Sequence, residues 1–158
     1  MNLPACPLRI RSGAEKDSRY VFDPVRQKYV RLVPEEWVRV HFLHFLIRDC
    51  GYPPALIAVE MHFEYQGMSR RADIVAHDRQ GIPSLMVECK APEVRIGSAA
   101  FEQIAKYNRV VGARYLAVTN GLRHYCWPSD RPDDFMDCIP PFEAVSAGDP
   151  ASDTQPTL

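Results

Sequence analysis

The sequence lacks the features that define several large classes of protein. It has no apolar run approaching the roughly 20 residues of a membrane-spanning helix, and its N-terminus lacks the basic-then-apolar pattern of a secretory signal. No glycine-rich phosphate loop is present, which argues against a nucleoside triphosphatase. We therefore expect a cytoplasmic protein without membrane contact.

Paired cysteines are also missing. The five cysteines are scattered, and none forms a Cys-x-x-Cys pair. This pattern argues against a disulfide scaffold and against a structural zinc site, and it suits a reducing compartment. The five histidines show no metal-ligand spacing either.

The composition is that of an ordinary globular domain, but the charge is uneven. Residues 130–158 hold seven acids and one base, a net charge of −6; because the whole chain carries −1, residues 1–129 carry +5. A mildly basic body permits phosphate binding without requiring it. We expect a flexible N-terminal arm (1–18), one folded domain (19–128) and an acidic, proline-rich extended tail (129–158) whose last dozen residues are disordered.

Apolar spacing predicts alternating helices and strands within the folded domain. Pro34 and the two acids after it suit the first turn of a helix. The predicted elements are an irregular strand or hairpin over 19–33, a helix over 35–49, strands over 56–65, 71–77 and 85–90, a helix over 98–111 capped by Ser98, and strands over 115–119 and 124–127. Short turns between the three central strands predict an antiparallel meander, and the helical crossover from 90 to 115 predicts a parallel pair. The fold class is an α/β sandwich with a mixed sheet.

Three charged residues stand out in apolar strands. Glu88 and Lys90 end one strand and share a face, because side chains alternate along a strand, and Asp73 lies in the preceding strand. With the intervening turn centred between Arg79 and Gln80, Asp73 lies opposite Met86 and diagonal to Glu88, within side-chain reach. Two carboxylates suit Mg²⁺, and a lysine can hold or deprotonate a water and steady phosphate charge. The alternative is a solvated sheet face with one Glu–Lys ion pair, and the spacing alone favours neither.

These residues match a known pattern. An aspartate followed by Glu-x-Lys on the neighbouring strand resembles the PD-(D/E)XK nuclease superfamily. The chain is most similar to the domain at the N-terminus of the type I restriction enzyme R subunit, over roughly residues 19–127. The resemblance rests on five stretches: PEEWVR (34–39), RADIV (71–75), VECKAP (87–92), QIAKYN (103–108) and VTNG (118–121). It implies a restriction-endonuclease-like sandwich flanked by two helices, and it concerns the nuclease module without motor domains.

The resemblance adds residues to the site. It implies a glutamate from the first helix, for which Glu35 is preferred over Glu36; the alternative is that both acids only stabilise the helix N-terminus. The metal ligands would be Asp73, Glu88, the backbone carbonyl of Cys89 and Glu35. Departing from the family, Val33 stands where a hydroxyl residue often caps the first helix.

A second helix contributes in the resembling family through a Gln-x-x-x-Tyr motif. Gln103 and Tyr107 match it and share a helix face. Gln103 would orient the site, and Arg71, Gln103, Lys106 and Tyr107 would contact nucleic acid. The alternatives are an exposed amide beside a half-buried aromatic ring, and ordinary solvated charges.

The resemblance implies a magnesium-dependent deoxyribonuclease, with Mn²⁺ as a substitute for Mg²⁺, acting on DNA in restriction, repair or defence. A non-catalytic nucleic-acid-binding or structural subunit with the same fold is the alternative. The small surface of the chain makes a homodimer or a larger protein partner plausible in either case.

Overall fold

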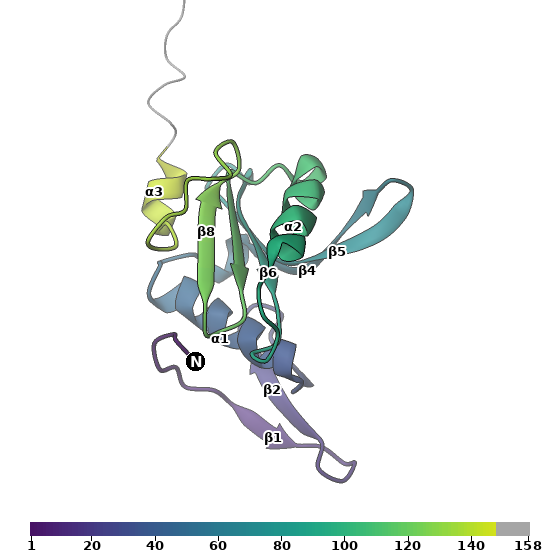
Figure 1. The fold of residues 1–158 in the computed structure, drawn as a ribbon. Coiled ribbons are helices and arrows are strands. Elements are labelled where there is room, and N and C mark those ends of the chain that lie inside the picture. Colours follow the sequence, from purple (N-terminus) through teal and green to yellow (C-terminus); the bar gives the residue numbers. More distant parts are fainter. Residues whose placement is uncertain (148–158) are drawn as a thin grey trace, which may run out of the picture.

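The computed structural model describes residues 1–147, which form two β-sheets and two long helices (Figure 1). The N-terminal sheet is antiparallel with strand order β1-β2-β3, and the central sheet is mixed with order β4-β5-β6-β7-β8. The elements are β1 (Ile10–Ser12), β2 (Arg19–Asp23), β3 (Lys28–Arg31), α1 (Pro34–Arg48), β4 (Ile57–Tyr65), β5 (Met68–His77), β6 (Pro83–Cys89), α2 (Ser98–Val111), β7 (Tyr115–Thr119), β8 (His124–Pro128) and α3 (Phe142–Ser146), with a 3-10 turn at Pro54–Leu56. The predicted α/β fold class is confirmed.

The two long helices begin and end for local reasons. Pro34 is the first residue of α1, a position where the backbone N–H that proline lacks would have no partner within the helix. Glu35 and Glu36 follow at the positive end of the helix dipole. The prediction that Ser98 caps α2 is wrong, because Gly97 occupies the cap position and Ser98 is the first helical residue. Gly112 ends α2 in the left-handed conformation that glycine adopts readily.

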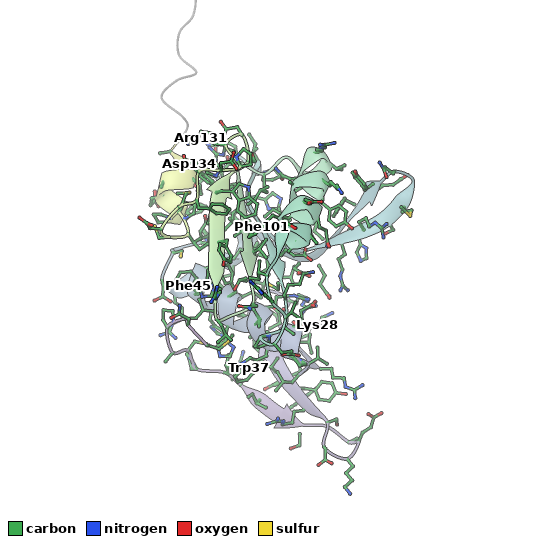
Figure 2. All side chains as sticks on the ribbon, in the orientation of Figure 1. Lys28, Trp37, Phe45, Phe101, Arg131 and Asp134 are labelled. Atoms are coloured by element: carbon green, nitrogen blue, oxygen red, sulfur yellow. The ribbon has the colours of Figure 1, made fainter. Side chains whose placement is uncertain are left out.

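The central sheet carries apolar side chains on both faces, and a helix covers each. One buried cluster joins α1 to the sheet through Val38, Phe42 and Leu46, and a second forms around Ile104 of α2. Figure 2 shows Phe101 of α2 directed at the sheet, where it packs edge-on against Tyr125 and Trp127 of β8. The β6–α2–β7 crossover makes β6 and β7 parallel, as predicted.

The predicted register between β5 and β6 is wrong by two residues. Met86 pairs with Val75 rather than with Asp73, and Ile74 pairs with Val87. The connecting loop is longer than a two-residue turn, because the Asp78 carboxylate accepts the amides of Gln80 and Ile82 and a bulge follows Ala76. A shift of two residues keeps every side chain on its predicted face.

Both ends of the described chain are more ordered than an arm and an extended tail. β1 pairs with β2, and Arg9 and Arg11 stack on the rings of Phe22 and Tyr29. These aromatic contacts give a polar segment enough surface to hold a third strand.

Towards the C-terminus, the chain returns to the core instead of leaving it. Phe142 of α3 is buried edge-on against Tyr52, and Tyr52 Oη donates to the carbonyl of Pro140 at 2.9 Å. The short helix forms because its apolar side chains have a core surface against which they are buried.

The predicted domain boundaries stay proposals, and the disorder predicted for the last dozen residues falls almost entirely outside the described ones. Within the described chain, no helix combines the length and apolar character needed to cross a bilayer.

Candidate functional site

The site begins where β5 and β6 stop pairing. The last pair is Ile74 with Val87, and the buried side chain of Asp73 turns into the opening beyond it. Its Oδ2 accepts the backbone N–H of Cys89 at 2.7 Å, and its Oδ1 lies 3.3 Å from Nη2 of Arg39. Asp73 therefore joins the end of β6 to helix α1.

Glu88 lies on β6 with its carboxylate almost fully buried. Its Oε1 accepts hydrogen bonds from Nζ of Lys90 at 2.6 Å and from Nε2 of Gln103 at 3.0 Å. Burial raises the pKa of Glu88, the charge of Asp73 raises it further, and Lys90 offsets part of that rise. Two acids thus share a poorly solvated space, which is an arrangement that a bound cation would stabilise.

Lys90 follows the last residue of β6 and points to the same side as Glu88. Its backbone N–H donates to the carbonyl of Thr119 at 2.8 Å, which fixes the chain at the strand end. Burial alone would lower the pKa of Lys90, but the hydrogen bond to Glu88 and the nearby acids raise it above its ordinary value. The ammonium form is therefore the stable one at neutral pH.

The two helix acids have different surroundings. Glu36 is buried between Arg26 and Arg39, at 2.7 Å and 3.0 Å. Glu35 is 42% exposed, with one longer contact of 3.4 Å to Arg39. Its charge nevertheless acts on Glu88 and Lys90. Glu35 is thus the acid with freedom to turn towards Asp73 and Glu88, whereas Glu36 is fully engaged in ion pairs.

Three residues beside the site were not among the sequence predictions. Arg39, Glu60 and Arg26 form a continuous chain of ion pairs that ends at Asp73. Arg39 could have been found from its spacing of four and three residues after Glu35 and Glu36, which places it on the same helix face. Glu60 also interrupts an apolar strand run, but the sequence gives no indication of its arginine partners.

The residues predicted to contact nucleic acid divide between two grooves that flank the site. Arg71 lines a groove between β3, α1 and β4, and lies 2.8 Å from Glu60. Gln103, Lys106 and Tyr107 line a second groove between α2 and the tip of the β4–β5 hairpin. Lys106 is exposed, whereas the ring of Tyr107 packs against Phe63 and Tyr65. Only Gln103 of the four contacts a candidate catalytic side chain.

The chemistry of the acids suits a hard divalent cation. Asp73 and Glu88 provide carboxylate oxygens, and the carbonyl of Cys89 follows Glu88 directly in sequence. No cluster of three or more His, Cys, Asp or Glu side chains able to hold a metal occurs within residues 1–147. Mg²⁺ does not require such a cluster, since it keeps several waters and commonly binds one or two protein carboxylates. The donor set therefore fits Mg²⁺, and Glu35 is the exposed helix acid whose charge acts on Glu88.

Comparison with known proteins identifies the family. Residues 34–140 match the model of the type I restriction enzyme R protein N terminus (HSDR_N). The chain belongs to this family. The matched HSDR_N region begins at α1, so it contains every predicted site residue but leaves out the N-terminal sheet. The sequence-based resemblance is confirmed.

A solved structure shares the fold. It is a fragment of a protein assigned as the HsdR subunit of a type I restriction enzyme from Vibrio vulnificus YJ016, with a TM-score of 0.58 and 18% sequence identity. The alignment covers 72% of the present chain and 24% of the other, so this chain spans about a quarter of that protein's length. No curated protein matches the chain. The shared fold and the family are thus established, whereas the roles of individual residues stay predictions.

Proposed function

We propose that this HSDR_N domain is a magnesium-dependent nuclease that hydrolyses phosphodiester bonds of DNA, in the restriction or defence setting that the family name indicates. The observation that carries the proposal is the contact of Lys90 with Glu88 at 2.6 Å, beside the buried Asp73. A lysine and two acids converge there from the strands that the nuclease motif requires. Asp73, Glu88, the Cys89 carbonyl and Glu35 would hold the ion, and Mn²⁺ would replace Mg²⁺.

A bound divalent ion would supply an activated water and neutralise charge on the scissile phosphate. The side chains perform the remaining tasks. Lys90 stays protonated, so it is suited to orient the attacking water and to stabilise phosphate charge rather than to remove a proton. Gln103 holds Glu88 through Oε1, which leaves Oε2 for the ion. Asp73 is held by the Cys89 amide and Arg39, so it needs little reorganisation.

The substrate class follows from the two grooves. Each contains an exposed or half-exposed basic residue, Arg71 in one and Arg70 and Lys106 in the other. Neighbouring positions of β5 therefore direct one arginine to each side of the site. A phosphate backbone that crosses Asp73 and Glu88 would meet a cation on either side, which favours a polyanionic strand.

A non-catalytic DNA-binding subunit is the second candidate. It is favoured by the partners that both acids have within the chain. Asp73 contacts Arg39 and the Cys89 amide, and Oε1 of Glu88 accepts from Lys90 and Gln103. In that case the lysine and arginine replace the metal, and the fold holds DNA without turnover.

Metal titration separates the two functions. Thermal unfolding and cleavage of a labelled DNA duplex are followed while Mg²⁺ or Mn²⁺ is added, with Ca²⁺ as a control ion. If the chain is a nuclease, the midpoint of thermal unfolding should rise with metal concentration, and the DNA should be cleaved in Mg²⁺ and in Mn²⁺. The binding subunit predicts salt-dependent, metal-indifferent DNA binding without cleavage.

A further inference from the structure

Glu60 has an unusual backbone conformation for a residue inside a strand. Its φ is 54°, in the left-handed region that non-glycine residues seldom occupy. Its neighbours Val59 and Met61 pair with Ile74 and Ala72, so Glu60 lies at the position opposite Asp73. Strained conformations of this kind persist where the surroundings fix them, and they concentrate at functional sites.

The carboxylate of Glu60 explains why the conformation is held. It contacts three arginines: Arg26, Arg39 at 3.1 Å and Arg71 at 2.8 Å. These arginines come from the β2–β3 turn, α1 and β5. A regular strand conformation at Glu60 would place its side chain differently, so the left-handed backbone and the three ion pairs belong together.

Arg39 connects Glu60 to Asp73. It is 2% exposed, and its Nη1 contacts Glu60 at 3.1 Å and Glu36 at 3.0 Å. Its Nη2 is directed at Asp73 Oδ1, 3.3 Å away. Because the guanidinium is planar and rigid, fixing Nη1 also fixes the direction of Nη2.

We propose that Glu60 is a positioning residue, which aims Arg39 at Asp73 and thereby holds Asp73 in the site. Arg26 extends this support to the N-terminal sheet, outside the region matched by the family. Its guanidinium joins Glu60 and Glu36 to Asp23, which is completely buried. The sheet β1-β2-β3 is therefore part of the framework of the site. The role of Glu60 in positioning Asp73 does not depend on the proposed function; only its expected effect on DNA cleavage does.

The position of the Asp73 side chain can be measured without an assay of DNA cleavage. The Cys89 amide donates to Asp73 Oδ2, so its hydrogen exchange reports whether Asp73 is in place. Exchange is measured by NMR in the natural chain and in Glu60→Gln and Glu60→Gly. Glutamine keeps the shape without the charge, whereas glycine suits the left-handed backbone and has no side chain. The amide of Met86 in mid-strand is the internal reference, and Glu64→Gln, at an exposed position on the same strand, is the matched control.

The proposal predicts that Cys89 exchanges at least roughly ten-fold faster in both Glu60 variants, relative to Met86, and at its natural rate in Glu64→Gln. Natural protection of Cys89 in either Glu60 variant would overturn it, because the carboxylate would then be dispensable. Should neither Glu60 variant fold, Arg39→Lys decides. Lysine keeps the charge but cannot contact Glu36, Glu60 and Asp73 at once, so natural protection of Cys89 in that variant would also contradict the proposal.

Cleavage gives a second and separable readout. If the natural chain cleaves DNA, Glu60→Gln should lower kcat by roughly ten- to a hundred-fold with KM little changed, as expected for a displaced catalytic group. A change confined to KM would contradict positioning of Asp73. If the natural chain does not cleave DNA, the proposed function fails, while the exchange of the Cys89 amide still decides the role of Glu60.

Discussion

Nε2 of Gln103 lies 3.0 Å from Oε1 of Glu88. Helix α2 therefore directly contacts the carboxylate of a residue on β6, the middle strand of the central sheet. The same oxygen accepts from Lys90. One oxygen of Glu88 is thus occupied by donors from two elements, which fixes the orientation of the other. This contact links the second helix to the candidate site, and the role of Gln103 in orienting that site stays a prediction.

Replacement of Gln103 should impair both cleavage and stability. Gln103→Ala removes one hydrogen bond to a charged group, an interaction of about 1.5–3 kcal/mol, and frees Glu88 to rotate. We expect DNA cleavage to slow by roughly ten-fold or more. Steady-state kinetics and thermal unfolding measure the two effects. Val110→Ala, at an exposed position near the end of α2 and outside the groove, is the control, and equal cleavage by the two variants would refute the role of Gln103.

The ion pairs of Arg26 should contribute strongly to stability. Arg26→Met leaves the fully buried Asp23 and the buried Glu36 without this partner. Removal of one member of a buried pair destabilises by about 3 kcal/mol or more. Urea unfolding measures the change.

The matched control uses an arginine from an exposed pair. Arg131 lies 2.9 Å from Asp134 on the surface (Figure 2), and Arg131→Met should change stability by no more than about 1 kcal/mol. Similar losses in the two variants would show that Arg26 is only a surface charge.

Packing of α3 on the core should also be measurable. Phe142 is 4% exposed and packs on Tyr52. Phe142→Ala removes a buried ring, and we expect a loss of about 3 kcal/mol in unfolding free energy. Glu143→Ala, one residue along on the exposed face, should have little effect. An equally small effect at Phe142 would mean that residues 129–147 do not belong to the folded core.

Stability should fall when the pH drops through the histidine range. Burial lowers the pKa of His41, His44 and His124 below the ordinary value of 6.5. The unfolded chain therefore binds protons at a higher pH than the folded chain does. The stabilising contribution of the neutral rings is complete above the unfolded pKa and is lost as the pH falls towards the folded pKa values.

Urea unfolding at about pH 7.5 and at about pH 6 tests this direction. His124 is the most informative position, because its ring also bonds to Thr119 and to the carbonyl of Asn2. His124→Gln should lose less stability over this interval than the natural chain does. A larger loss of stability in His124→Gln than in the natural chain would contradict the lowered pKa of His124.

The elements were largely predictable because their signals are local. The helix over 98–111 and the strand over 115–119 have the predicted bounds, and α1 differs by one residue at each end. Pro34 and Gly112 mark helix ends through their own backbone preferences. The register of β5 with β6 was not predictable in the same way, since it depends on the Asp78 loop and on a bulge.

The candidate site was predictable only in part. Asp73, Glu88 and Lys90 are identifiable because charges interrupt apolar strands, and Gln103 because it matches a spaced motif. The spacing of Arg39 after Glu35 and Glu36 is a local signal, but its contacts with Glu60 and Asp73 join residues distant in sequence. The left-handed backbone of Glu60 has no sequence marker. Helix α3 is not evident from the sequence, because proline content and acidity obscure the few apolar residues of this segment that pack on the core.

We propose that DNA is hydrolysed at Asp73, Glu88 and Lys90 with a divalent metal. The most direct test of this claim is single-turnover cleavage of an end-labelled DNA duplex in Mg²⁺ by the natural chain, by Lys90→Ala, and by Lys16→Ala as a control at an exposed turn. We predict cleavage by the natural chain and Lys16→Ala, and loss of cleavage in Lys90→Ala with its thermal unfolding and DNA binding retained. Equal cleavage by Lys90→Ala, or a folded natural chain that binds DNA and Mg²⁺ but leaves the duplex intact, would contradict the claim.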